Sequence, residues 1–427
     1  MRTTLSMHHI ARIEGHGNIS LSIEDGRVSD VKMNVVEPAR LFESMVGGRP
    51  FTQTSYIASR ICGICSSSHV ITDLLAIEQI FGVKTSERTR VLRELLVYGS
   101  FLQNHAAHLF VFAAPDFEGL DSAFPLAESA PELFNGGMAI KALGNELCTL
   151  VGGRSIHPIT CVVGGFTHEP SRDDCLAMAD KVVAAREFCE KTVDVFAGFK
   201  VPQIETSGDF MALVEDGRYC VVGDTAAFAS DGARFAAADY TDNIEEYAVD
   251  HSAARFSRRA STKKNITTSA LARINLSWNE LSQPARLAAA KAGLRPPVRN
   301  PFLNNVAQAV ELVDALERCA DLCRRLANDE FEGSSEPVAF TPCAGKGTGF
   351  TEAPRGTVFH ELELDDEGRV VHASIITPTA QNVANLEGDM LLLAENVLEF
   401  DASPDKIRAE IEKLVRAYDP CFSCSVH

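Results

Sequence analysis

Two pairs of cysteines with the same spacing, one near each end of the chain, are the residues best suited to chemistry in this sequence. Cys62 and Cys65 form the first pair, and Cys421 and Cys424 form the second. Thiolates three residues apart can point to one side of a helix or a turn and bind one metal ion. Two such pairs supply four thiolates, which suffice for a tetrahedral site of four sulfur atoms.

Several kinds of metal site are compatible with four cysteines: structural zinc, an iron–sulfur centre, or a catalytic or redox metal. The pairs of a zinc ribbon are usually about 15–20 residues apart, whereas Cys65 and Cys421 are about 350 residues apart. A site built from both chain ends suits a centre buried in the middle of a large domain. The spacing therefore favours a catalytic or redox metal and leaves zinc open.

Composition and charge limit the classes of function. The chain has 427 residues, of which 45% are hydrophobic and 23% charged, as in ordinary globular proteins. Its net charge of −18 argues against nucleic acid or an anionic membrane as the main partner. No stretch approaches the roughly 20 apolar residues of a membrane span, and the N-terminus lacks an apolar signal segment. We expect reduced thiols and a cytoplasmic location, unless a signal on a partner chain exports the complex.

Hydrophobic periodicity predicts the elements that must position the cysteines. A β-hairpin is expected over 8–36, and two strands over 356–377 around a turn at 365–368. Helices are expected over 54–81 (weakest at Gly63), 87–112 (ending before Pro115), 172–199, 305–327, 386–400 and 404–417. Prolines and glycines predict a long loop over 114–138 and a connection over 284–301, and residues 202–282 are mixed.

The chain has no internal repeat, low-complexity tract or flexible linker. This predicts one large domain over residues 1–427, of the α+β class. It would be mainly helical, with small β-hairpin or sheet elements in its N-terminal and C-terminal parts.

Five motifs are distributed along the chain from residue 12 to residue 427. They are Arg12-Ile-Glu14-Gly-His16-Gly, Arg60-Ile-Cys62-Gly-Ile-Cys65-Ser-Ser-Ser-His69, Glu352-Ala-Pro-Arg355-Gly, Ile376-Thr-Pro378-Thr379-Ala-Gln-Asn382 and Asp419-Pro-Cys421-Phe-Ser-Cys424-Ser-Val-His427. Together they resemble the large, catalytic subunit of nickel–iron hydrogenases and run in that family's order, so the resemblance covers essentially the whole chain. The last two motifs are most similar to those of the cytoplasmic, soluble hydrogenases linked to NADP or sulfur compounds.

The resemblance implies a set of metal ligands. Cys62 and Cys421 would bind nickel alone, while Cys65 and Cys424 would bridge nickel and iron. The iron would also carry carbon monoxide and cyanide, which nothing in composition or spacing shows. Soft thiolate ligands suit both metals.

The resemblance also implies catalytic groups. A lone acid such as Glu14 would otherwise be read as solvated surface, but in the family this residue passes the proton from a metal thiolate to the exit path. Arg355 would lie over the open metal position and donate to a cyanide, held in place by Asp419. Pro378 and Thr379 would line the site, and Thr379 would donate to the other cyanide.

A further cation and a histidine complete the implied site. Glu43, the carbonyl of Ile375 and His427 would bind a magnesium or iron ion, since oxygen ligands suit a hard cation. The chain stops at His427, which is where the mature subunits of the family end. His69 would hydrogen-bond a bridging thiolate and tune its basicity.

Other chemical residues are interpreted as structural. His105 and His108 lie three residues apart on an apolar helix, and a buried structural role fits them at least as well as a functional one. The residue before His105 is Asn104, where many relatives carry an acidic residue. Gly345-Lys346-Gly347 lacks the spacing of a phosphate loop. Cys343 has no assigned role. The remaining cysteines are expected to be apolar core residues: Cys148, Cys161, Cys175, Cys189, Cys220, Cys319 and Cys323.

The chain has no further cysteine cluster that would hold iron–sulfur centres. Electrons would therefore leave through an iron–sulfur small subunit docked over the Cys62–Cys65 segment, with further flavin-, nucleotide- or sulfur-linked subunits behind it. Two alternatives remain beside the hydrogenase: a non-hydrogenase relative like the related complex I subunit, which lacks the cysteine pairs, and a structural zinc-binding protein.

Overall fold

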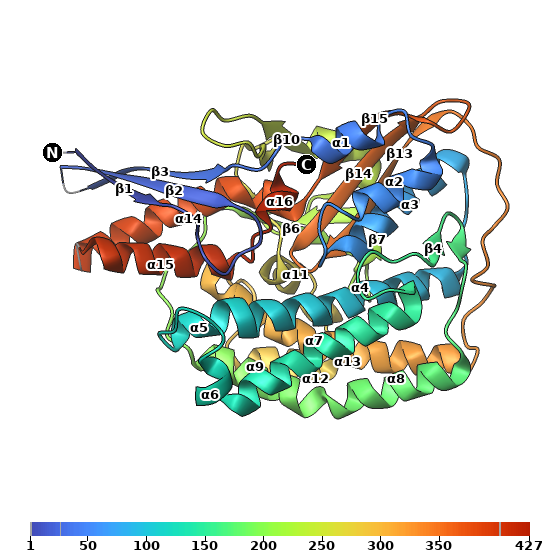
Figure 1. Cartoon of the computed structure of the whole chain (residues 1–427), viewed down its shortest axis with the longest axis horizontal. Helices are drawn as coiled ribbons and strands as arrows, with labels where there is room; N and C mark the ends of the chain where they lie inside the picture. Colours follow the sequence, from blue (N-terminus) through green and yellow to red (C-terminus); the bar gives the residue numbers. More distant parts are fainter. Residues whose placement is uncertain (1, 26, 401–402) are drawn as a thin grey trace.

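The computed structural model describes residues 2–25, 27–400 and 403–427. A bundle of long helices forms one layer, and a four-stranded sheet covered by helix α3 lies next to it (Figure 1). A separate N-terminal sheet extends to one side along helices α14 and α15 (Figure 1). This mixture of long helices and small sheets confirms the α+β class.

Two helices of the bundle, α4 and α7, pack closely against each other at a glycine. A Cβ atom on Gly144 of α7 would lie 2.6 Å from the backbone nitrogen of Gln103 on α4, so only glycine lets these two helices approach this closely. Ser86 caps α4 by accepting a hydrogen bond from the Thr89 N–H. The bundle consists of α4 (Glu87–Ala107), α7 (Pro131–Gly152), α8 (Arg172–Ala184), α9 (Arg186–Gly198), α12 (Gln283–Lys291) and α13 (Asn304–Ala327).

The four-stranded sheet next to the bundle is antiparallel, and helix α3 (Ser66–Phe81) packs against it. A Cβ atom on Gly347 would lie 2.1 Å from the Ala76 carbonyl oxygen of α3, and one on Gly349 would lie 2.3 Å from the Thr72 carbonyl oxygen. The alternating glycines therefore allow the helix to lie on the strand. The strand order is β15 (Val370–Ile376), β14 (Gly356–Leu364), β13 (Gly345–Ala353) and β7 (Val222–Gly223).

The N-terminal sheet packs on the C-terminal helices, which brings the two ends of the chain together. Its strand β3 contacts α14, where the Glu387 carboxylate accepts the Met33 N–H at 2.6 Å. The elements involved are β1 (Arg2–Met7), β2 (Gly17–Glu24), β3 (Arg27–Val35), α14 (Pro378–Phe400) and α15 (Pro404–Ala417).

Shorter elements connect these layers. The short helices are α1 (Leu41–Val46), α2 (Phe51–Ala58), a π-helix (His108–Ala113), α5 (Ala114–Phe117), α6 (Leu126–Ser129), α10 (Tyr240–Asn243), α11 (Ala270–Leu276) and α16 (Phe422–Ser425). The 3-10 turns are Ala237–Asp239, Trp278–Glu280 and Pro301–Leu303. The remaining strands are β4 (Cys161–Val162), β5 (Gly165–Phe166), β6 (Asp209–Leu213), β8 (Thr225–Phe228), β9 (Arg234–Ala236), β10 (Ile244–Tyr247), β11 (Phe256–Arg259) and β12 (Ile266–Thr267). Among them is another four-stranded sheet, of mixed direction, with the order β12-β6-β8-β9.

The predicted loop over 114–138 is wrong in its second half, because α7 begins at Pro131. Gly137 lies inside this helix, where a Cβ atom would come within 2.2 Å of the Phe110 ring. The glycine thus serves close packing rather than a turn. The helix predicted to end before Pro115 instead continues as helical turns to Phe117, since proline is tolerated in the first turn of α5.

The other predicted helices and strands are present with shifted boundaries. The helix over 54–81 is α2 and α3, separated at 59–65, which contains the predicted weak point. The segment 172–199 forms two helices that meet at Ala185, and the connection over 284–301 starts with α12. The strands around the turn at 365–368 are as predicted. Among the described residues, no helix combines the length and the apolar character that crossing a membrane requires.

Candidate metal centre

The structure brings the two cysteine pairs together from opposite ends of the chain. Cys62 and Cys65 lie in the connection between α2 and α3, and Cys421 and Cys424 lie at the start of α16. All four are buried, and they share a small apolar cluster with residues such as Ile375. This meeting of both chain ends supports the site expected from the sequence.

The sulfur atoms converge on one point. Cys421 Sγ lies 3.6 Å from Cys62 Sγ, and the sulfurs of Cys62, Cys421 and Cys424 all lie within 4.8 Å of one another. The sequence led us to expect reduced thiolates, whereas the structure joins Cys421 and Cys424 as a disulfide. Both must be reduced to act as ligands. Soft sulfur donors gathered in a buried position fit nickel and iron.

Cys65 completes the set through its neighbours. The hydrogen bond from Cys65 lowers the pKa of Cys62 to about 7, although burial opposes this, and the same bond raises the pKa of Cys65. Arg355 Nη1 lies 3.6 Å from Cys65 Sγ and 3.9 Å from Cys62 Sγ. The hydrogen bond to Cys62 and burial raise the pKa of Cys65, and the arginine opposes both effects by favouring the thiolate.

Arg355 is held over the cysteines by Asp419, as the resemblance implied. Its Nε donates to the Asp419 carbonyl oxygen at 2.8 Å and to Oδ1 at 3.0 Å. Burial alone would raise the pKa of Asp419, but Arg355 holds it below its usual value. The amides of Asn104 and Gln308 donate to the other carboxylate oxygen at 2.8 Å and 2.9 Å. Sequence reasoning missed Gln308, which lies on α13.

Glu14 lies against the second cysteine pair. A parallel β-bridge joins Glu14 to Cys421, and the Glu14 carbonyl oxygen accepts the Phe422 N–H at 3.0 Å. Glu14 Oε2 lies 2.9 Å from Cys421 Sγ, and Oε1 accepts a hydrogen bond from the Ser423 hydroxyl at 2.5 Å. Gly15 makes this approach possible, since a Cβ atom there would lie 2.6 Å from the Ser423 nitrogen. Sequence reasoning missed Ser423.

The residues predicted to bind a hard cation lie close together. The contact between Glu43 and Ile375 uses the N–H of Ile375, whereas the prediction used its carbonyl oxygen. Glu43 Oε1 accepts the N–H of Ile375 at 2.8 Å, and Arg40 Nη1 donates to both carboxylate oxygens of Glu43 at 2.6–2.7 Å. His427 Nδ1 accepts the Phe42 N–H at 3.5 Å. Burial, and then Arg40, lowers the pKa of His427 to about 4, so its imidazole is neutral, as a metal ligand must be.

His69 lies in a buried chain of polar side chains. Its Nδ1 is 3.1 Å from His360 Nε2, and His360 Nδ1 is 3.4 Å from Asp73 Oδ1. The Thr54 hydroxyl donates to the other Asp73 oxygen at 2.5 Å. Burial strongly lowers the pKa of His69. The structure therefore pairs His69 with His360, which sequence reasoning did not connect to the site.

The start of α14 supports the second cysteine pair. This helix begins at Pro378, and the hydroxyl oxygen of Thr379 accepts the Cys421 N–H at 3.0 Å. The neighbouring Thr377 hydroxyl donates to the Cys424 carbonyl oxygen at 2.9 Å. These contacts hold the cysteine segment in place and leave the Thr379 O–H proton available to another acceptor.

The residues interpreted as structural are buried as expected. His105 Nε2 lies 2.8 Å from Glu311 Oε2, and His108 Nδ1 lies 2.5 Å from Gln308 Oε1. Cys343 is exposed. The buried cysteines outside the site are Cys148, Cys161, Cys175, Cys189, Cys220, Cys319 and Cys323.

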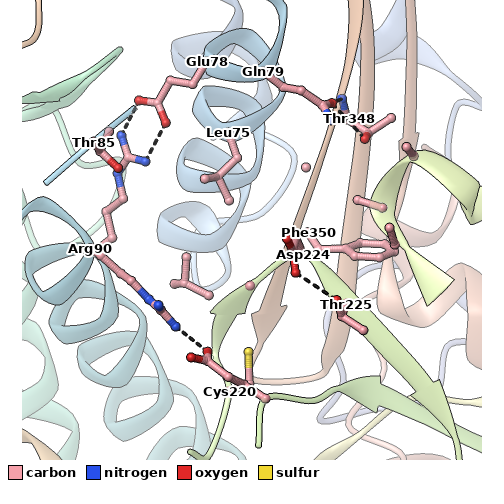
Figure 2. Close-up of a pocket in the computed structure, with 18 of the residues that line it drawn as sticks. Leu75, Glu78, Gln79, Thr85, Arg90, Cys220, Asp224, Thr225, Thr348 and Phe350 are labelled. Atoms are coloured by element: carbon pink, nitrogen blue, oxygen red, sulfur yellow. Dashed lines mark hydrogen bonds and ion pairs between the residues drawn. The ribbon is translucent and has the colours of Figure 1, made fainter. Parts of the chain in front are cut away.

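One cavity in the structure is separate from this centre. It measures about 760 Å³ and is lined by Leu75, Glu78 and Gln79 of α3 and by Thr348 and Phe350 of β13 (Figure 2). These positions on α3 lie at least ten residues beyond Cys65, which is about 15 Å along a helix. None of the predicted site residues lines this cavity among the residues that the structure describes.

Comparisons with known proteins agree with this site. A family model described as nickel-dependent hydrogenase matches residues 40–132 and 303–427, and one described as HoxL-like matches residues 4–37. Sulfhydrogenase 1 subunit alpha from Pyrococcus furiosus is 34% identical, over 99% of this chain and 97% of that protein. NAD-reducing hydrogenase HoxS subunit beta from Cupriavidus necator is 28% identical, over 100% of this chain and 95% of that protein.

Solved structures share the fold. A crystal structure of an NAD+-reducing NiFe-hydrogenase in the H2-reduced state has a TM-score of 0.86 and 26% identity, covering 100% of this chain and 99% of that chain. The Ni-Fe-Se hydrogenase from D. vulgaris Hildenborough has a TM-score of 0.76 and 25% identity, covering 100% of both chains. Because both cysteine pairs fall within the matched segments and the relatives extend over nearly the whole chain, this protein belongs to the nickel-dependent hydrogenase family.

Proposed function

We propose that this chain is the catalytic subunit of a heteromeric nickel–iron hydrogenase, in which H2 is reversibly cleaved to protons and electrons. The convergence of Cys62, Cys65, Cys421 and Cys424 in one buried site, between Arg355 and Glu14, is the observation that carries this proposal. The oxidoreductase activity on H2 follows from the family. The ligands, residue roles and partners below are our assignments.

The four cysteines would hold the metals. Cys62 and Cys421 would bind nickel alone, and Cys65 and Cys424 would bridge it to an iron that carries carbon monoxide and cyanide. When bound, this centre supplies the redox-active Lewis acid at which H2 is polarised and split. The lowered pKa of Cys62, at about 7, supports a thiolate ligand at this position.

Arg355 and Thr379 would each donate a hydrogen bond to one of the cyanides. The buried guanidinium of Arg355 is a permanent planar donor, which suits an anionic ligand, and Asp419 fixes its orientation. The hydroxyl of Thr379 already accepts from the Cys421 N–H and keeps its own proton for a second acceptor. Pro378 places this threonine in the first turn of α14.

Glu14 would move the proton. Heterolytic cleavage needs a base close to the metals, and Glu14 Oε2 is 2.9 Å from Cys421 Sγ. The Ser423 hydroxyl and backbone N–H both bond the Glu14 carboxylate, which keeps it facing the sulfur. Protons would pass from the Cys421 side to Glu14 and from there towards solvent.

A hard cation would bind next to the centre. Glu43, the carbonyl of Ile375 and neutral His427 are the proposed ligands for magnesium or iron. Arg40 supplies the positive charge beside Glu43 in this structure. His69 would hydrogen-bond a bridging thiolate and tune its basicity.

Electrons would leave where the cysteine segment reaches the surface. Gly63, between the two buried cysteines, is exposed, and so is Tyr56 of α2. The exposed Ile156 precedes His157, whose N–H donates to the Ser66 hydroxyl at 2.9 Å. An iron–sulfur small subunit would dock here, followed by flavin-, nucleotide- or sulfur-linked subunits. The relatives are named as alpha or beta subunits, so they belong to heteromeric enzymes. We place the complex in the cytoplasm.

Metal analysis of the purified complex tests the proposal. We expect about one nickel per chain, infrared bands of metal-bound carbonyl and cyanide, and H2-dependent dye reduction. Zinc alone would support a structural zinc protein. Neither metal, with no infrared bands, would support a non-hydrogenase relative.

A further inference from the structure

A fully buried arginine on α11, Arg273, binds the backbone that carries Arg355. Its Nη1 donates to the Ala353 carbonyl oxygen at 3.0 Å, and its Nη2 donates to the Pro354 carbonyl oxygen at 2.8 Å. These carbonyls belong to the two residues immediately before Arg355. The Arg273 side chain is 1% exposed, so water does not compete for these bonds.

Two carboxylates fix the Arg273 guanidinium in turn. Glu311 accepts from Nε at 2.6 Å and from Nη2 at 2.7 Å, and Glu352 accepts from Nη1 at 2.8 Å. The second oxygen of Glu352 accepts from the Thr357 hydroxyl at 2.7 Å and from the Leu213 N–H at 2.8 Å. The five N–H donors of Arg273 therefore all have buried acceptors.

We propose that Arg273 is a positioning residue for H2 turnover: it fixes the backbone at 353–354 and so places the Arg355 guanidinium over Cys62 and Cys65. Asp419 holds Arg355 at its side-chain end, and Arg273 holds it at its backbone end. This inference rests on the proposed function, because its readouts come from the metals that the cysteines would hold.

Arg273→Lys is the most specific single substitution for testing this positioning role. Lysine keeps the charge that compensates Glu311 and Glu352, but its one ammonium cannot reach both carboxylates and both carbonyls. We expect nickel content to stay close to the parent value, turnover per nickel to fall about tenfold, and the cyanide stretching bands to shift.

Arg93→Lys is the matched control. Arg93 on α4 is as deeply buried and makes a similar two-pronged pair with Glu78, at 2.8 Å and 2.6 Å. It lines the separate cavity and not the metal centre. We expect both lysine variants to lose thermal stability, whereas turnover per nickel and the cyanide bands should stay at their parental values in Arg93→Lys.

A double-mutant cycle with Arg355→Lys separates positioning from a general structural effect. If Arg273 acts through Arg355, adding Arg273→Lys to that background should change turnover less than about twofold. The inference is overturned if Arg273→Lys leaves the bands in place, or lowers turnover by the same factor in both backgrounds. A parent complex without nickel or cyanide bands would instead overturn the proposed function.

A second variant tests the same inference if Arg273→Lys does not fold. Glu311→Gln is isosteric and weakens the pair that orients Arg273, so the same band shift and the same dependence on Arg355 are expected. Unshifted bands and parental turnover in this variant overturn the inference equally.

Discussion

Glu14 and Cys421 are 407 positions apart in the chain, yet Glu14 Oε2 lies 2.9 Å from Cys421 Sγ. The backbone makes this contact possible, because a β-bridge aligns the two residues and Gly15 leaves room for the Ser423 nitrogen. A carboxylate in contact with a proposed metal thiolate is well placed to take up a proton.

Glu14→Gln should separate metal assembly from proton release. Glutamine is nearly isosteric and still accepts the Ser423 hydrogen bond, but it cannot accept and pass on a proton. We expect parental nickel content and infrared bands, while H2 oxidation and H2/D+ exchange each fall at least ~100-fold. Para/ortho-H2 conversion should survive, because it needs no proton from solvent.

The control for this variant is Glu37→Gln, which removes a carboxylate that contacts His16 in the same segment. It should exchange H2 with solvent deuterons at the parental rate. If Glu14→Gln does so too, Glu14 is not the proton acceptor and the proton leaves by another path, such as one starting at Arg355 and Asp419.

Cys421→Ser should abolish nickel retention and activity together. A hydroxyl is a hard and poorly ionised replacement for a thiolate, and Cys421 Sγ lies within 4.8 Å of the sulfurs of Cys62 and Cys424. Nickel analysis of the purified chain measures the effect, with Cys343→Ser at an exposed cysteine as the control. Full nickel with normal turnover in Cys421→Ser would contradict the ligand assignment.

Arg355→Lys should keep the metals and lower turnover per nickel at least ~100-fold, about 3 kcal/mol of barrier. An ammonium cannot reproduce a planar guanidinium that contacts Asp419 and both thiols of the first pair. Asp419→Asn should cost less, because Arg355 Nε keeps its bond to the Asp419 carbonyl oxygen. Near-normal H2 oxidation by Arg355→Lys would rule out the role.

Removing His427, or leaving residues attached beyond it, should prevent closure of the metal site. The His427 side chain is buried and packs edge-on against Phe42, so added chain at this end has to be buried or redirected. Nickel and magnesium content, with the chain mass from mass spectrometry, measure the effect. A fully active enzyme that still carries the extension would disprove this prediction.

Asp389→Asn should change how stability depends on pH. Burial raises the pKa of Asp389 to about 6, above the usual value of 3.8, so the folded chain holds a proton that the unfolded chain has already lost. Stability therefore falls as pH rises between these values and stays reduced above about 6. Asparagine removes this penalty, which is at most about 3 kcal/mol.

The thermal midpoint of the Asp389→Asn variant, compared with the parent, measures this effect. The variant should gain more at about pH 8 than at about pH 5. The Tyr418 hydroxyl donates to Asp389 at 2.6 Å, and an amide oxygen can still accept that bond. An equal gain at both pH values would show that Asp389 does not titrate in this range.

Local patterns in the sequence determined much of the fold. The helix over 404–417 and the strands around the turn at 365–368 were predicted almost to the residue, since their periodicity and turn residues act over a few positions. The cysteine spacing likewise predicts a metal site, because two thiolates three residues apart can bind the same metal ion. The extent of the domain, residues 1–427, and the roles of individual site residues stay predictions.

Only the tertiary structure decided which side chains support those groups. Ser423 bonds Glu14, His360 bonds His69, and Arg273 bonds the backbone before Arg355, and none of these partners is close in sequence. Gly137 lies inside α7, where the Phe110 ring occupies the space of a Cβ atom, so this glycine serves close packing and does not mark a loop. Buried polar bonds and close contacts depend on atoms that are far away along the chain, so a local pattern does not contain them.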